Sequence, residues 1–83
     1  MPTNEGLLKR ITARPDVFGG KPIIRDMRIS VELILSLLSQ GADMDELLDD
    51  YPELEPEDIR ACLAYAHAVI VRDTLAAVSV AES

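Results

Sequence analysis

The stretch from Phe18 to Val31 constrains the fold of this chain more than any other, because it combines special backbone, positive charge and alternating apolar residues. Its paired glycines allow backbone conformations with positive φ, and the proline that follows fixes the direction of the chain. Three isoleucines then flank a short polar turn that exposes Arg25 and Arg28. A hydrophobic core alone does not require this mixture, so the stretch predicts a small β-arm.

The spacing of the apolar residues becomes helical after this arm. Ser30 is a suitable N-cap, because its hydroxyl can accept a hydrogen bond from a free amide of the first turn. Gly41 is a C-terminal stop signal. Together they predict a first helix over residues 31–40, with an apolar stripe of Val31, Ile34, Leu35 and Leu38.

A second helix is predicted over residues 44–50. Asp43 and Glu46 have the spacing of a capping box, and Ala42 can contact Leu47 across the first turn. Pro52 ends the helix, because the residue before a proline is displaced from the helical region.

Pro56 suits the first position of a third helix, which we expect over residues 56–77. This helix is apolar almost all round, and helices of this kind are normally buried on more than one side. The two shorter helices cannot cover both faces, so we expect one face to pack against a second subunit. The residues assigned to this oligomer interface are Cys62, Tyr65, Val69 and Ile70.

Eighty-three residues predict a single domain, and a domain of this size has a modest core that self-association can complete. Residues 1–9 are expected to be a loose leader, followed by a short strand over residues 10–12. The longest apolar run, residues 61–66, is too short to span a membrane, and the N-terminus has no signal region, so we expect a cytoplasmic protein.

The formal net charge of −7 is distributed unevenly. Residues 1–30 carry six basic and three acidic groups, whereas residues 31–83 carry two basic and twelve acidic groups. Nucleic acid could approach only the basic arm without long-range repulsion, and a basic protein would suit the acidic body. The alternative is that both are ordinary solvated surfaces.

The chain resembles a family of small bacterial and archaeal proteins known as domain of unknown function 433. The matching motifs are Gly20-Lys21-Pro22, Arg25, Arg28-Ile29, Val31, Gln40-Gly41, Asp50-Tyr51-Pro52 and Pro56-Glu57-Asp58-Ile59-Arg60-Ala61. Two positions depart from the family pattern, since Asp26-Met27 stands where Gly-Thr is usual and Ser30 stands where proline is common. The resemblance implies a mainly α, homeodomain-like three-helix (helix-turn-helix) domain with a short N-terminal β-arm or hairpin. It also implies an antitoxin role beside a toxin with a PIN-type nuclease fold.

Several charged groups are candidates for contact with a partner or with nucleic acid. The arm offers Lys21, Arg25 and Arg28, the third helix offers Arg60, and the second helix offers Asp45, Glu46, Asp49 and Asp50. The acidic group is a poor metal site, because a hard cation prefers about six oxygens and neighbouring surface carboxylates rarely supply more than two. We therefore expect no metal and no cofactor.

Catalysis is not expected either. Cys62 and His67 are the single cysteine and the single histidine of the chain, and their spacing on a helix places them about 140° apart. Two side chains so arranged cannot readily cooperate as nucleophile and base.

The leading hypothesis is a homodimeric, antitoxin-like module that neutralises a PIN-like nuclease. Either the acidic helix mimics RNA phosphates, or Arg25 or Arg28 enters the metal-binding carboxylates of the toxin. There are two alternatives. The first is a transcriptional regulator that binds DNA through the basic arm, because the acidic start of the third helix opposes docking in the major groove. The second is an orphan structural dimer.

Overall fold

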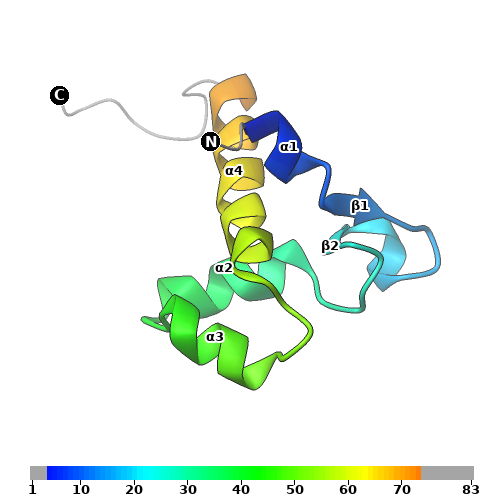
Figure 1. The fold of residues 1–83 in the computed structure, drawn as a ribbon. Coiled ribbons are helices and arrows are strands. Elements are labelled where there is room, and N and C mark those ends of the chain that lie inside the picture. The colour runs from blue at the N-terminus through cyan, green and yellow to red at the C-terminus, as the bar shows by residue number, and fades with distance from the viewer. Residues whose placement is uncertain (1–3, 74–83) are drawn as a thin grey trace, which may run out of the picture.

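The chain is mainly α-helical, with one two-stranded antiparallel hairpin (Figure 1). The computed structural model describes residues 4–73. Within them α4 stands upright, α2 and α3 lie around its N-terminal end, and α1 lies beside it (Figure 1). The elements are α1 (Asn4–Leu8), β1 (Ile11–Ala13), a 3-10 turn (Phe18–Gly20), β2 (Pro22–Ile24), α2 (Val31–Ser39), α3 (Met44–Asp50) and α4 (Pro56–Asp73).

The predicted β-arm forms a hairpin that is packed into the body. Strand β1 pairs with β2 so that Ile11 lies opposite Ile24 and Ala13 lies opposite Pro22. Ile23 and Ile24 are both fully buried. The hairpin is therefore part of the core, and it does not project as a free arm.

The turn after β2 depends on two residues with left-handed backbone. Arg25 has φ 44° and Asp26 has φ 62°, and the Met27 amide donates to the Ile24 carbonyl over 2.7 Å. Positive φ at both central positions is the signature of a type I′ turn. Aspartate tolerates this region better than most residues, which explains how it can stand where glycine is usual.

The helix boundaries follow local capping chemistry, as the sequence predicts. The Ser30 hydroxyl accepts from the Leu33 amide over 3.0 Å at the start of α2. Asp43 and Glu46 form a complete capping box at the start of α3. Gly41, with φ 105°, follows the end of α2.

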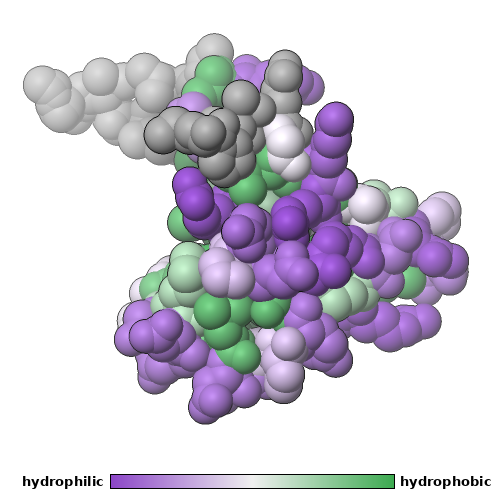
Figure 2. Space-filling model, viewed as in Figure 1, coloured by the Kyte–Doolittle hydropathy of each residue, from purple (hydrophilic) through white to green (hydrophobic). Residues whose placement is uncertain are grey.

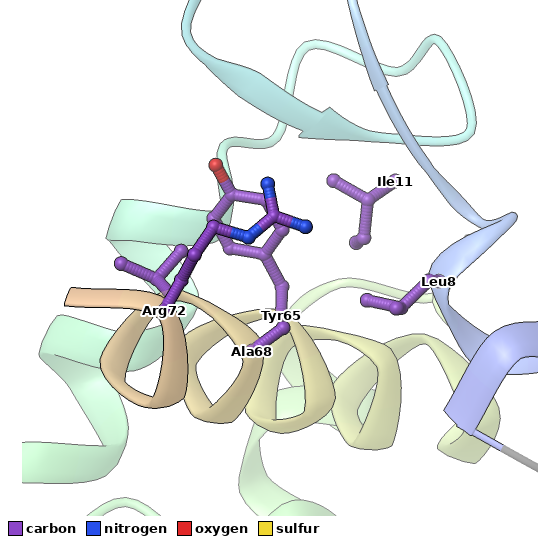
Figure 3. A pocket seen from close by; sticks show the side chains of 6 residues that line it. Leu8, Ile11, Tyr65, Ala68 and Arg72 are labelled. Carbon is purple, nitrogen blue, oxygen red and sulfur yellow. The ribbon is translucent and has the colours of Figure 1, made fainter. Parts of the chain in front are cut away.

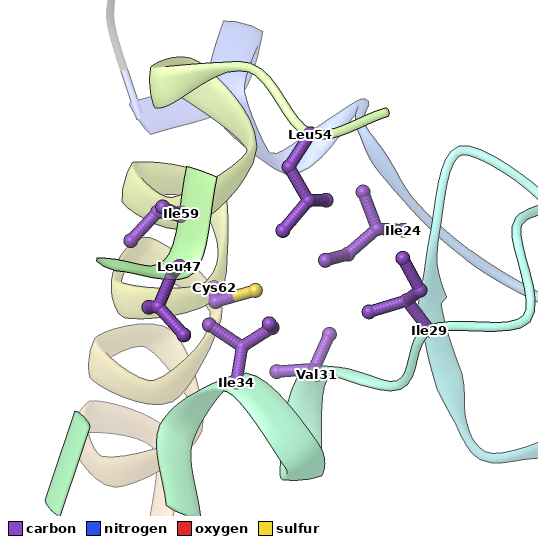
Figure 4. Packing of buried hydrophobic residues seen from close by; sticks show 8 residues of the cluster. All are labelled: Ile24, Ile29, Val31, Ile34, Leu47, Leu54, Ile59 and Cys62. Carbon is purple, nitrogen blue, oxygen red and sulfur yellow. The ribbon is translucent and has the colours of Figure 1, made fainter. Parts of the chain in front are cut away.

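One hydrophobic cluster joins the hairpin to the three longer helices (Figure 4). Leu54 and Ile59, which flank the start of α4, both belong to it, as a hydrophobic staple requires. The thiol of Cys62 points into the middle of the cluster. Its buried members are Ile24, Ile29, Val31, Ile34, Leu47, Leu54, Ile59 and Cys62.

The expectation of a loose leader is wrong for residues 4–8, which form helix α1. Leu7 packs with Ala61 and Ala64 of α4 in a second small buried cluster. Helices this short are unstable in isolation, so α1 depends on packing against α4. The small side chains of the two alanines leave room for α1 to lie close to α4. This contact joins residues far apart in the chain, so the first nine residues alone do not reveal it.

The assignment of Cys62 to an oligomer interface also needs correction. Cys62 has no exposed surface and packs inside its own chain. The outward side of α4 instead carries Leu63 and Ile70, which are 49% and 64% exposed. The expected extension of this helix through residue 77 lies outside the described residues.

Candidate functional site: a buried carboxylate and an acidic surface

A buried carboxylate at the start of α4 organises the charges around it. Asp58 has no exposed surface. Arg25 donates to it twice, from Nε to Oδ1 over 2.9 Å and from Nη2 to Oδ2 over 2.7 Å. Arg10 donates from Nη1 to Oδ1 over 2.9 Å. Two arginines from the hairpin region are thus held by one aspartate of α4.

Backbone groups complete this arrangement. The Glu55 amide donates to Asp58 Oδ2 over 2.8 Å, so the carboxylate also caps the first turn of α4. Arg25 Nη2 donates to the Glu53 carbonyl over 3.0 Å, and Arg10 donates to Glu55 Oε1 over 2.8 Å. The network therefore ties the residue before β1, the turn after β2 and the α3–α4 loop to the start of α4.

The pKa of Asp58 reflects two opposing effects. Burial raises this pKa, because a charged carboxylate loses its hydration. Hydrogen bonds from Arg25, the Glu55 amide and Arg10 lower it, and together they outweigh burial, so the pKa lies below its usual value. Asp58 is therefore ionised at neutral pH.

Because of this network, the predicted contact residues of the basic arm are not equally available to a partner. Removal of Arg25 would leave the buried Asp58 charge with only Arg10 and the Glu55 amide as partners, at a cost of about 2–3 kcal/mol. Lys21 Nζ forms an exposed ion pair with Glu32 over 2.9 Å. Arg28 is exposed, and the described residues provide no partner for it. The three cations predicted as one contact surface thus occupy three different environments.

Other carboxylates near the start of α4, on α3, the following loop and the first turn of α4, are free of such partners. We define the acidic surface as five exposed carboxylates that have no hydrogen bond or ion pair with the described residues. Glu46, also predicted as a contact residue, is used in the capping box of α3. Figure 2 shows hydrophilic side chains at the outer edge of α3, beside an apolar area. The acidic surface consists of Asp45, Asp49, Asp50, Glu53 and Glu57.

Arg60, a further predicted contact residue, is exposed and is also unpaired among the described residues. It lines a shallow hollow with Leu7, Leu63, Ala64 and His67. The start of α4 beside it differs from the sequence-based view, because Asp58 is buried and Glu57 alone of the two carboxylates faces solvent.

Two largely apolar hollows lie beside α4 and share Tyr65 and Val69, of which Val69 is 39% exposed. In the first hollow Leu8 and Ile11 lie across from Tyr65, with Arg72 at the rim (Figure 3). The second hollow is also lined by Lys21, Pro22, Val31, Glu32, Leu35 and Ser36.

The described residues contain no group of three or more histidine, cysteine or acidic side chains placed to hold a metal ion. Burial raises the pKa of the Cys62 thiol to about 12, and the nearby Asp58 charge adds to this effect. A thiol of this kind is not a nucleophile at neutral pH. No helix within residues 4–73 is both long and apolar enough to cross a bilayer.

Sequence reasoning missed Arg10 and Asp58 as the centre of the charge network. A signal was present in Glu55-Pro56-Glu57-Asp58, because an acidic residue three positions after an N-cap can accept from the N-cap amide. The arginine partners had no local signal, since they lie 33 and 48 residues away along the chain.

Known proteins resemble this chain over most of its described length. An uncharacterized protein of Sinorhizobium fredii, y4eO, is 33% identical over 58 residues, which make up 70% of this chain and 26% of that protein. The crystal structure of a DUF433 member protein from Anabaena variabilis superposes with a TM-score of 0.70 at 38% identity. The match covers 77% of this chain and 63% of that one. This chain thus spans about a quarter of the first protein and under two thirds of the second.

The family match confirms the resemblance that the sequence motifs indicated from the arm to the start of α4. Residues 11–66 match the family described as proteins of unknown function (DUF433). This stretch includes the hairpin, the turn with Arg25, both capped helices and the buried Asp58. The chain therefore belongs to the DUF433 family.

Proposed function

We propose that this protein is an antitoxin-like interaction module, which acts as a homodimer and neutralises a nuclease toxin with a PIN-like fold. One observation carries the proposal: the acidic surface presents five unpaired carboxylates on α3, the adjoining loop and the first turn of α4. Like charges on one helix face are unfavourable by ~0.2–0.5 kcal/mol per pair. A basic partner would neutralise this repulsion between the carboxylates.

Of the two inhibitory routes that the sequence suggests, we favour phosphate mimicry by the acidic surface. A nuclease that binds RNA needs a basic groove, and closely spaced carboxylates can occupy such a groove as phosphates would. If Arg25 entered the toxin, it would have to leave Asp58, and the loss of this pair would destabilise the fold. Only Arg28 would then remain for the arginine route.

We further propose that α2, α3 and α4 correspond to the three helices of a homeodomain-type helix-turn-helix. Supporting this, α3 and α4 are joined by a short connection, residues 51–55, and both pack on α2 through one core. In this assignment the helix-turn-helix serves as a scaffold for protein contact. The acidic surface lies where a DNA-reading protein would need positive charge.

A role without catalysis is consistent with the chemistry of the reactive side chains. Cys62 is buried and its pKa is raised, while His67 lies on the exposed side of α4. The two hollows beside Tyr65 are lined mainly by apolar groups, which suit contact with a protein segment better than catalysis.

The test is affinity purification of the full chain from its native cells, followed by an RNA-cleavage assay on any small nuclease that accompanies it. We expect the purified chain to suppress cleavage by that nuclease. Replacement of Asp45 and Asp49 by asparagine should weaken suppression at least tenfold, and added salt should weaken it further.

A matched control also removes two negative charges, but at positions outside the acidic surface. Asp16→Asn with Glu32→Gln alters carboxylates that already have exposed ion-pair partners outside α3, so suppression should be unchanged. Equal losses in both double variants would indicate a general charge effect and refute the acidic surface. Recovery of the chain with DNA that is lost at physiological salt, and with no protein, would favour the regulator instead.

A further inference from the structure

The outward side of α4 carries an apolar stripe that residues 4–73 leave uncovered. Leu63 and Ile70 are 49% and 64% exposed, and Ala66 lies between them on the same side. We define these three residues as the outer stripe. The opposite side of the helix packs on the domain through Ala61, Cys62 and Tyr65.

The spacing within the outer stripe is three and then four residues. This is the spacing of the a and d positions that form the seam between two paired helices. Ala66 at its centre is small, so a second helix can approach closely at that point. A helix is therefore the shape that this stripe best accommodates.

The charges around the stripe favour a second copy of the same chain. From Arg60 to Arg72 α4 contains no carboxylate, although the chain as a whole has a net charge of −7. Two copies can thus approach along this segment without opposing carboxylates. Pairing of two copies through α3 or the α3–α4 loop would instead bring their acidic surfaces together, and these would repel each other.

We propose that two copies of the chain pair through their outer stripes with α4 antiparallel. The inference rests on the homodimeric part of the proposed function and names its surface. Antiparallel pairing sets Leu63 opposite Ile70 of the second copy and places Ala66 near the two-fold axis, which makes the stripe its own complement. It also moves the two acidic surfaces, which lie at the N-terminal end of α4, to opposite ends of the dimer (Figure 1).

The size of the stripe limits the strength of this contact. Seven residues of helix span about 10 Å, so the described part of the interface is small compared with the ~1,200–2,000 Å² of a permanent complex. We therefore expect a reversible monomer–dimer equilibrium that depends on protein concentration.

Analytical ultracentrifugation of the full chain over a range of concentrations tests the surface. Ile70→Glu should weaken dimerisation at least tenfold. The matched control is Val71→Glu, because Val71 is the adjacent residue, is 63% exposed and points about 100° away from Ile70. Equal weakening by both variants, or a wild-type chain that stays monomeric throughout, would overturn the proposal.

Disulfide trapping tests the orientation by a second measurement. A mixture of Leu63→Cys and Ile70→Cys chains should form the mixed disulfide, because these positions face each other only in the antiparallel pair. Leu63→Cys alone should remain unlinked, and its rapid linkage would show parallel pairing. Wild-type chain supplies the background, since its buried Cys62 is inaccessible.

These outcomes separate the interface from the wider function. If Ile70→Glu chains become monomeric and still suppress the nuclease, the interface stands and the homodimer is dispensable for neutralisation. If Ile70→Glu and wild-type chains dimerise equally while the nuclease is suppressed, the interface is wrong and the antitoxin role stands.

Discussion

Arg25 meets Asp58 through two hydrogen bonds, of 2.9 and 2.7 Å, although the two residues are 33 positions apart in the chain. Arg25 also occupies left-handed backbone, with φ 44°. Such backbone costs of order 1 kcal/mol for a residue other than glycine. The paired hydrogen bonds to a buried carboxylate offset that cost and fix the turn against the start of α4.

Loss of this pair should destabilise the fold measurably. We expect Arg25→Met to lower the free energy of unfolding by about 2–3 kcal/mol, somewhat below the ~3–5 kcal/mol for loss of a sole partner, because Arg10 and the Glu55 amide still compensate Asp58. Urea denaturation measures the change. Arg28→Met, just after the same turn, is the matched control and should fall within about 0.5 kcal/mol of wild type.

Stability should also fall in acid because of Asp58. Its pKa is lowered in the folded chain, so its contribution is present above the unfolded value of 3.8 and is lost as the pH falls toward the folded value. Urea midpoints measured between pH 6 and pH 2 should therefore decrease below about pH 4. In Asp58→Asn the stabilisation by the ionised carboxylate is absent at every pH. The difference in stability between this variant and wild type should therefore shrink in acid. A constant difference would contradict this account.

The type I′ turn predicts opposite responses to two substitutions at Asp26. Asp26→Gly should leave stability unchanged within about 0.5 kcal/mol or raise it slightly, because glycine adopts φ 62° without steric cost. Asp26→Val should destabilise by about 1–2 kcal/mol, because a β-branched residue resists that conformation. Thermal unfolding distinguishes them, with Asp16→Val as a control at an exposed loop position where φ is not positive.

Cys62 should be inert until the chain unfolds. Its thiol is buried in the main core, and its pKa is raised to about 12. A thiol reagent at pH 7–8 should label the native chain at least about a hundredfold more slowly than the chain in denaturant. Rapid labelling of the native chain would mean that α4 separates readily from α2 and α3.

Local sequence chemistry determined the helix boundaries. Ser30, Asp43 and Gly41 act within four residues of the amides or carbonyls that they cap, so their spacing in the sequence suffices to place the ends of α2 and α3. The hairpin was recognisable for the same reason, because the glycines, Pro22 and the alternating isoleucines specify strand and turn locally.

The candidate contact residues were predictable only in part. The acidic residues of α3 were placed correctly on the surface, since a seven-residue amphipathic helix has an evident outer side. The basic residues of the arm could not be sorted in the same way. Whether an arginine is free or paired depends on which carboxylate the fold brings near it, and that carboxylate was far away in the sequence.

The family, the mainly helical class, the caps and the uneven distribution of charge were predictable, because each depends on residue identity and short spacing. The formation of α1 and the meeting of Asp58 with Arg10 and Arg25 were not, because they depend on contacts between residues far apart in the chain. The inward side of Cys62 and the outward sides of Leu63 and Ile70 were not predictable either. A helix that is apolar all round has no preferred face of its own, and its inner and outer sides are set by the elements that pack against it.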